Sequence, residues 1–186
     1  MTSDPLSIGL TVLGRSQAAD VAQGWLDAPA LIVTSPAQRA LDTAAPTISR
    51  FSGVPVQVWP VEEFAYLSPR RCAGTTVHDR RQWVAAYWDR ADPRHHDADD
   101  AETFEMFISR VTGAIERCLA QPATPGRRCV LFGHGQFINA MRWLAGAPAS
   151  NLDMRSFRTF DLAHPVANCQ MVEVDLQVFA QGRTNK

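Results

Sequence analysis

The sequence lacks three features that would place it in a special class. It has no apolar run long enough to cross a membrane, and its opening residues, MTSDPLSIGL, have neither the basic region nor the apolar core of a signal peptide. Its formal net charge is -1, so no overall field attracts nucleic acid or an anionic membrane surface. We therefore expect a cytoplasmic protein with no nucleic-acid or membrane partner.

Cysteine is also scarce, and its spacing excludes the usual metal and redox motifs. The four cysteines, Cys72, Cys118, Cys129 and Cys169, are far apart and show none of the paired spacings typical of zinc or dithiol sites. We expect buried free thiols in a reducing compartment.

The length of 186 residues, with 46% hydrophobic and 20% charged residues, suits one substantial core. No internal repeat, low-complexity tract or linker divides the chain. We therefore predict a single domain over residues 1–186, with a helical and loop insertion around residues 64–100, where hydrophobic periodicity weakens.

Short apolar runs alternate with helical patterns along the chain. The predicted strands are ALIVT (30–34), VPVQVWP (54–60), RCVLF (128–132) and CQMVEVDLQVF (169–179). The predicted helices cover residues 15–27, 35–51, 80–92, 101–120 and 136–146. This alternation predicts an α/β fold with three α/β/α layers and a mostly parallel sheet.

The start of the second predicted helix carries several helix signals. Ser35 can be the N-cap, Pro36 occupies the first helical position, and Gln38 completes a capping box. Pro46, further along, is expected to kink or interrupt the helix.

Two predicted strand ends carry residues suited to binding an anion. Arg39 follows ALIVT in the first helical turn, and His134 stands between Gly133 and Gly135 where VLF meets the next helix. Helix N-termini favour anions, and ligands bind beyond the carboxyl ends of parallel strands. Arginine offers a planar charged fork for phosphate oxygens, and histidine can donate a hydrogen bond or move protons near neutral pH.

Several motifs resemble those of the histidine phosphatase superfamily, the phosphoglycerate-mutase-like proteins. TSPAQRALDTAAP resembles the family's Ser-Pro-x-x-Arg-Ala-x-x-Thr-Ala signature, and VLFGHGQFINAMRWLAG resembles its second histidine motif, with Gly133 where a serine is more usual. LTVLGRSQA, WPVEEFAYLSP and AETFEMFISRV resemble three further segments, in the family's order.

The resemblance implies a metal-independent phosphatase without a cofactor, which forms a phosphohistidine and then hydrolyses it. Arg39 and His134 would bind the transferring oxygens, with the amide of Gln136 helping at the helix start. Glu63 would protonate the leaving oxygen, and Glu62 is the alternative acid.

The family's nucleophile, however, lies in an Arg-His-Gly tripeptide at the end of a first strand, and residues 1–10 contain no histidine, arginine or apolar strand. His78, His95, His96 and His164 do not stand at predicted strand ends that precede a helix. Three explanations stay open: a natural protein that starts upstream of Met1, a degenerate relative that only binds phosphate, or a second copy of the chain that fills the gap. The first is favoured, because the missing strand would be central to the sheet.

Two function classes follow from these observations. The leading hypothesis is a phosphohydrolase for a small phosphate ester or a phosphoprotein. The alternative is a non-catalytic module that binds a phosphorylated ligand, and a purely structural relic is a third option. A homodimer stays open, and a sugar-acid mutase is disfavoured because it needs a dedicated closed basic pocket.

Overall fold

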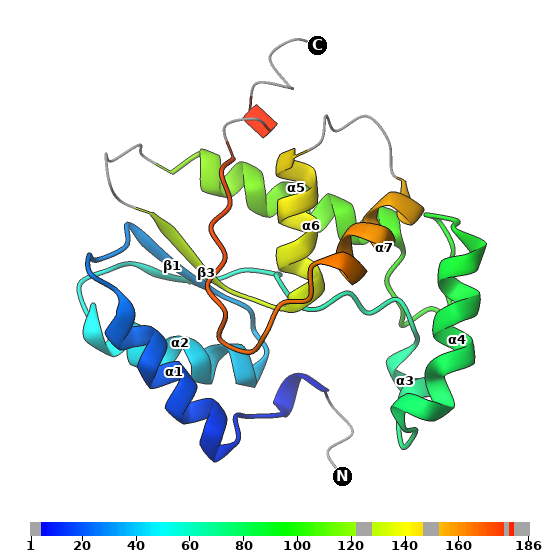
Figure 1. The fold of residues 1–186 in the computed structure, drawn as a ribbon, viewed down its shortest axis with the longest axis horizontal. Helices are drawn as coiled ribbons and strands as arrows, with labels where there is room; N and C mark the ends of the chain where they lie inside the picture. The colour runs from blue at the N-terminus through cyan, green and yellow to red at the C-terminus, as the bar shows by residue number, and fades with distance from the viewer. Residues whose placement is uncertain (1–4, 122–127, 147–152, 177–178, 181–186) are drawn as a thin grey trace.

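A computed structural model describes residues 5–121, 128–146, 153–176 and 179–180. Its strands are β1 (Leu31–Thr34), β2 (Val56–Val58) and β3 (Cys129–Phe132). Within this described part they form one parallel sheet in the order β2-β1-β3 (Figure 1). All four residues of the central strand β1 are buried, as a short continuous apolar run predicts.

Helices cover both faces of this sheet. They are α1 (Val12–Gly24), α2 (Gln38–Arg50), α3 (Pro69–Cys72), α4 (Val77–Arg90), α5 (Phe104–Leu119), α6 (Gly135–Gly146) and α7 (Met154–Ala163), after a short 3-10 turn at Pro5–Ser7. In Figure 1, α5 lies above the sheet and α1 and α2 lie below it. Along β1, Leu31 and Val33 join the core cluster of α5 and α6, whereas Ile32 packs with Ala44 of α2. The predicted three-layer α/β/α fold is confirmed.

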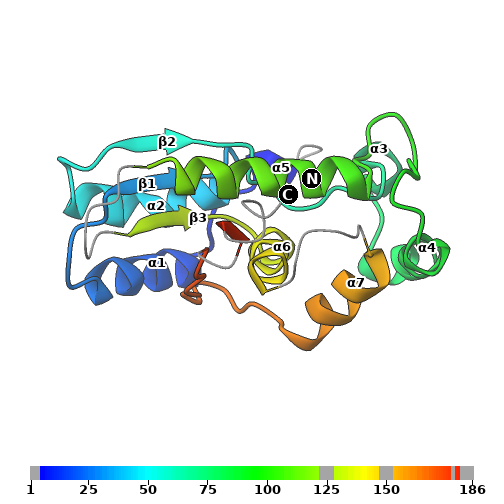
Figure 2. The same cartoon turned by 90° about the horizontal axis from the view of Figure 1, so that it is seen from above.

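An aromatic cluster joins the segment around residues 64–100 to the main core. Phe64 stacks on Phe107 of α5, with ring centroids 4.4 Å apart, and also contacts Tyr87 and Trp88 of α4. Phe157 of α7 also contacts Trp88. Figure 2 shows α3, α4 and α7 grouped beyond the carboxyl ends of the strands. The predicted insertion thus packs beside the edge of the sheet where ligands are expected.

The start of α2 differs from the prediction. The helix begins at Gln38, its N-cap is Ala37, and no side chain caps it. Ser35, the predicted N-cap, lies two residues earlier and accepts a hydrogen bond from the Ala37 amide instead. Gln38 bonds Asp42 rather than forming a capping box. The helix also continues through Pro46 to Arg50, so Pro46 does not interrupt it.

The predicted final strand over residues 169–179 is also wrong. Its described residues, 169–176 and 179, lie in no strand, although the side chains of residues 171–176 alternate between exposed and half-buried. Residues 177 and 178 lie outside the described part. The segment lies near β3, since Glu173 pairs with Arg128 at 3.4 Å. A strand requires ladder hydrogen bonds as well as alternation, and within the described residues β3 pairs only with β1.

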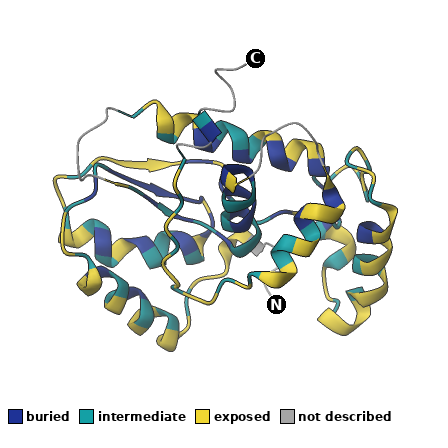
Figure 3. Cartoon of the chain, turned by 45° about the horizontal axis from the view of Figure 1, so that its top comes forward, coloured by how far each residue is buried: buried dark blue, intermediate teal, exposed yellow. Residues whose placement is uncertain are grey.

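The end of one helix, the start of another and the presence of a third differ from the prediction. Helix α1 ends at Gly24, so Trp25 and Leu26, which were predicted on its apolar face, lie outside the helix, and Leu26 is exposed. Figure 3 shows many exposed residues along α1. Helix α4 starts earlier than predicted, at a capping box of Thr76 and Asp79. The patterns did not predict α7, whose N-cap Asp153 accepts two backbone amides. In the described ranges, no helix is long and apolar enough to span a bilayer.

Candidate active site

The carboxyl ends of β1 and β3 bring Ser35 and His134 together. Thr34 and Phe132 are register partners in these parallel strands, so the residues that follow them emerge side by side. The Ser35 amide donates to the Phe132 carbonyl at 3.0 Å, which continues the pairing beyond the strands. His134 stands immediately before α6 and is 7% exposed, and Ser35 is fully buried.

His134 contacts both predicted anion-binding segments through its ring nitrogens. Nη2 of Arg39, in the first turn of α2, lies 3.1 Å from His134 Nδ1. The hydroxyl of Ser35 lies 3.0 Å from His134 Nε2. The structure therefore places Arg39 and His134 in direct contact.

The surroundings of His134 keep its ring neutral. Burial, together with the positive charges of Arg39 and Arg110, lowers the pKa of His134 from 6.5 to about 4. At neutral pH the imidazole therefore carries one N–H and one acceptor nitrogen, which is the form that can accept the hydrogen bond from Arg39.

Glu63 is held beside His134 by the first turn of α6. The Gln136 amide donates to Glu63 Oε1 at 2.9 Å, and the Phe64 amide donates to the same oxygen at 3.4 Å. Burial is the largest influence on this carboxyl group and raises its pKa above 4.5, against the opposing effect of these amides and of Arg39. A raised pKa is what a general acid needs. The Gln136 amide is engaged here, so a phosphate can use it only by replacing Glu63.

The neighbouring Glu62 faces a different partner. Arg110 of α5 donates to the carbonyls of Pro60 and Glu62, at 2.9 and 3.0 Å, and its guanidinium lies 3.6 Å from the Glu62 carboxylate. The same guanidinium binds Glu102 through two nitrogens, at 2.9 and 2.7 Å. Arg110 therefore fastens the segment after β2 to α5, and of the two predicted acids only Glu63 contacts the start of α6.

The side chain of Gln136 belongs to a polar network that was not predicted from the sequence. The Gln136 side chain donates to Asp161 of α7 at 3.1 Å, and Asn139 donates to the other oxygen of Asp161 at 2.9 Å. Arg158 pairs with the same carboxylate at 3.3 Å. Asn139 and Asp161 lie in helices whose apolar faces give the stronger sequence signal, so only the fold could bring them to the site.

Of the other histidines, His164 reaches this network through its backbone, since its carbonyl accepts a hydrogen bond from Asn139 at 2.8 Å. His78 lies in α4, His95 and His96 follow that helix, and His164 caps α7, where it bonds the Phe160 carbonyl. Within the described residues, no group of three or more His, Cys, Asp and Glu side chains is placed to hold a metal ion. The four cysteines are free thiols, but they are half-buried rather than buried.

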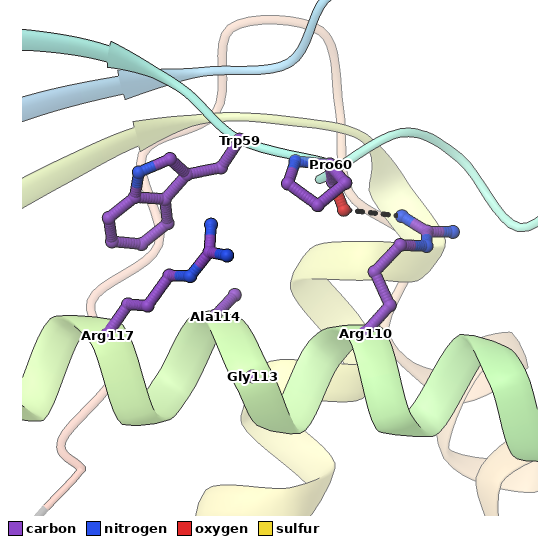
Figure 4. A pocket seen from close by; sticks show the side chains of 6 residues that line it. All are labelled: Trp59, Pro60, Arg110, Gly113, Ala114 and Arg117. Carbon is purple, nitrogen blue, oxygen red and sulfur yellow. Dashed lines mark hydrogen bonds between the residues drawn. The ribbon is translucent and has the colours of Figure 1, made fainter.

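A surface hollow of about 120 Å³ lies elsewhere, between α5 and the segment after β2 (Figure 4). Trp59, Pro60, Arg110, Gly113, Ala114 and Arg117 line it. The hydrogen bond from Arg110 to the Pro60 carbonyl crosses one end, and the Arg117 guanidinium lies 5.5 Å from the centre of the Trp59 ring. The hollow contains none of the predicted site residues, so we place the candidate site at Arg39 and His134 on the chemistry of the strand ends.

A sequence profile of the histidine phosphatase superfamily (branch 1) matches residues 3–177. The chain belongs to the histidine phosphatase superfamily. The match covers Arg39, Glu63 and His134 together, so the three predicted residues lie inside one family domain. A comparison with curated proteins found no match.

Solved structures share the superfamily fold. A mycobacterial glucosyl-3-phosphoglycerate phosphatase in complex with inorganic phosphate is 26% identical, with a TM-score of 0.62 over 80% of this chain and 74% of that one. Mycobacterial hydrolase 2 is 24% identical, with a TM-score of 0.66 over 89% of this chain and 70% of that one. Mycobacterial hydrolase 1 is also 24% identical, with a TM-score of 0.65 over 87% and 74%.

Proposed function

We propose that this chain carries the phosphoryl-binding part of a metal-independent phosphohydrolase, which acts on a phosphate ester or a phosphoprotein. The contact between Arg39 and His134 at two adjacent strand ends, with Glu63 beside them, carries the proposal. The phosphate complex of the related mycobacterial phosphatase supports the same ligand class. Arg39 and His134 would bind the phosphoryl oxygens, where positioning and electrostatics supply most of the rate enhancement.

The proposed reaction needs a nucleophilic histidine beside these residues. Its ring nitrogen would attack phosphorus, the ester P–O bond would break, and Glu63 would give its proton to the leaving oxygen. Water would then cleave the P–N bond and release phosphate. Residues 1–186 contain no Arg-His-Gly tripeptide. We propose that a strand added at the second edge of β3, from upstream sequence or from a second copy of the chain, supplies this histidine.

The second candidate function is phosphate binding without turnover. It is favoured by one observation: the histidine that the structure places against Arg39 and Ser35 is His134, the predicted phosphate-binding histidine rather than a nucleophile. In that case the chain would recognise a phosphorylated ligand through the same Arg39–His134 pair and release it unchanged.

Titration calorimetry with orthovanadate tests the site that both functions share. Arg39→Ala should weaken vanadate binding by about 10- to 100-fold, because it removes a charge-assisted hydrogen bond, and Arg39→Lys should lose less because it keeps the charge. Arg15→Ala, on α1, is the matched control and should leave the affinity unchanged. Absence of vanadate binding to the wild-type chain would contradict both candidate functions.

Turnover separates the two candidates. The 186-residue chain should hydrolyse an aryl phosphate slowly. A protein extended upstream through an Arg-His-Gly strand should hydrolyse it rapidly and form acid-labile phosphohistidine. Vanadate binding without turnover in either protein would favour the binding module.

A further inference from the structure

Two of the four free cysteines lie against each other between α5 and β3. The sulfur of Cys118, in the last turn of α5, lies 3.9 Å from the sulfur of Cys129, the first residue of β3. This is hydrogen-bond distance for two thiols, and no covalent bond joins them. Both side chains are half-buried and pack against the main core cluster. The proposed phosphatase chemistry uses neither of them.

The contact follows from the way β3 packs between two helix layers. Successive side chains of a strand point to opposite faces, and Val130 packs with Ala44 of α2. Cys129 therefore faces the other layer, where Cys118 continues the buried side of α5 three residues after Ile115. The fold thus brings together two sulfurs that are 11 residues apart in the sequence. Among the described residues, no other pair of cysteine sulfurs is in contact.

The two thiols differ in how readily they ionise. A hydrogen bond from Cys129 lowers the pKa of the Cys118 thiol, and giving that hydrogen bond raises the pKa of the Cys129 thiol. The thiolate is the form of cysteine that attacks an oxidant. Cys118 should therefore react first, with Cys129 already beside it as a second thiol. Cys169 lacks such a neighbour, and burial raises the pKa of its thiol.

We propose that Cys118 and Cys129 form a modification site for peroxides, at which the two thiols are converted to a reversible disulfide. The Cys118 thiolate attacks one peroxide oxygen, the O–O bond breaks, and a sulfenic acid and a hydroxide form. The sulfur of Cys129 then attacks the sulfur of Cys118, an S–S bond forms, and the sulfenic oxygen leaves. The two thiols lose two electrons and two protons in all, and one hydrogen peroxide becomes two water molecules. This site does not depend on the proposed phosphatase function.

The end of α5 gives the disulfide room to form. The two sulfurs must approach from 3.9 Å to about 2.05 Å, the length of an S–S bond. The helix ends just after Cys118, whose carbonyl accepts the amides of Ala120 and Gln121 in a tightened last turn. Such a turn can adjust without moving the rest of the helix. The crosslink would join the helix that carries Arg110 to the strand that leads to His134.

Thiol titration and peptide mapping by mass spectrometry test the proposal on the reduced 186-residue protein after treatment with hydrogen peroxide. The wild-type protein should lose two of its four thiols and yield a peptide pair linked through Cys118 and Cys129. Dithiothreitol should restore both thiols. Cys118→Ser should abolish the linked pair, whereas Cys72→Ser, the matched control, should keep it in full.

The same treatment in urea measures the contribution of the fold. The unfolded chain should give mixed pairings among the four cysteines, because only the fold holds Cys118 against Cys129. A native protein that gives the same mixture would overturn the proposal. Oxidation of Cys118 to its sulfinic acid in the native protein, with Cys129 still reduced, would also overturn it. Both results are read from the wild-type protein, so they remain decisive if a serine variant fails to fold.

Discussion

The carboxylate of Glu63 accepts the backbone amide of Gln136 at 2.9 Å, which joins the segment after β2 to the first turn of α6. Glu63 and Gln136 are 73 residues apart in the sequence, and their hydrogen bond places Glu63 beside His134, which precedes α6. It also satisfies an amide that α6 leaves without an intrahelical partner. The position of the acid therefore depends on the start of α6 as much as on its own segment.

Burial of Glu63 predicts a pH dependence of stability on the alkaline side of its ordinary pKa. Because the folded-state pKa is raised above 4.5, the native protein holds the proton more tightly than the unfolded chain, and the free energy of unfolding falls as pH rises through that window. Glu63→Gln keeps an acceptor for Gln136 and should be at least as stable as the wild type at about pH 8, an advantage that should vanish below about pH 4.5.

Urea unfolding at a series of pH values measures this effect. Glu62→Gln is the matched control, since it changes the neighbouring acid that faces Arg110, and it should leave the wild-type pH trend in place. A Glu63→Gln protein that is less stable than the wild type at alkaline pH would contradict the assignment of a buried, proton-holding carboxyl group.

The lowered pKa of His134 predicts that stability falls at acid pH, the opposite of the trend expected from Glu63. Its pKa of about 4 in the folded protein lies below the ordinary 6.5, so the unfolded chain binds the proton first. The resulting stability is fully present above about pH 6.5 and is lost as pH falls toward 4. His134→Gln should flatten this part of the stability curve, whereas His78→Gln on the exposed face of α4 should not. Equal acid sensitivity of the two variants, measured by thermal unfolding, would refute the prediction.

The contacts of Arg110 should contribute more to the free energy of unfolding than those of the exposed arginines. Its side chain and that of Glu102 are each 16% exposed, and it also binds two backbone carbonyls. Arg110→Met should cost about 2–3 kcal/mol, because it leaves a largely buried carboxylate and two carbonyls without their donor. The exposed pair of Arg94 and Glu105, 3.6 Å apart, gives the matched control, and Arg94→Met should cost at most about 0.5 kcal/mol.

A double-mutant cycle separates the ion pair from the carbonyl contacts. Adding Glu102→Gln to Arg110→Met should recover part of the loss, with a coupling energy of about 1–2 kcal/mol in urea unfolding. Strict additivity of the two substitutions would show that the pair itself contributes nothing.

The sequence predicted the sheet best where burial is complete. The LIVT part of ALIVT is fully buried, and Val130 and Phe132 are buried in β3, so continuous apolar runs identify both strands, and periodicity identifies α5 and α6. The prediction of a final strand was wrong because an alternating pattern shows which side chains face inward and does not show whether a neighbouring strand is present to form ladder hydrogen bonds. The predicted N-cap of α2 was wrong because the hydroxyl of Ser35 contacts His134, 99 residues away, instead of capping the helix.

The candidate site was predictable in part for a similar reason. Arg39 and His134 could be placed together because adjacent parallel strands end at one edge, a property of topology that short motifs reveal. Asp161 and Arg110 could not, since each reaches the site from a helix whose position depends on tertiary packing. The choice between Glu62 and Glu63 also depended on packing, because adjacent residues in an extended segment point in opposite directions.

Gly133, where the family pattern more often has a serine, should tolerate a small side chain. A Cβ added there would lie 2.8 Å from Leu131 Cδ2 and 3.5 Å from the Val61 carbonyl oxygen. The closer atom is the end of a half-buried, flexible side chain that can change rotamer, so Gly133→Ala and Gly133→Ser should each cost about 1 kcal/mol in urea unfolding. Gly133→Val should cost more, because its branches also approach the Val61 backbone, which cannot move as easily.

Leu131→Ala removes the contact, so Gly133→Ala should be nearly neutral in that background, with a coupling of about 0.5–1 kcal/mol. A loss above about 3 kcal/mol for Gly133→Ala alone would show that the backbone at this strand end, rather than the Leu131 side chain, sets the limit.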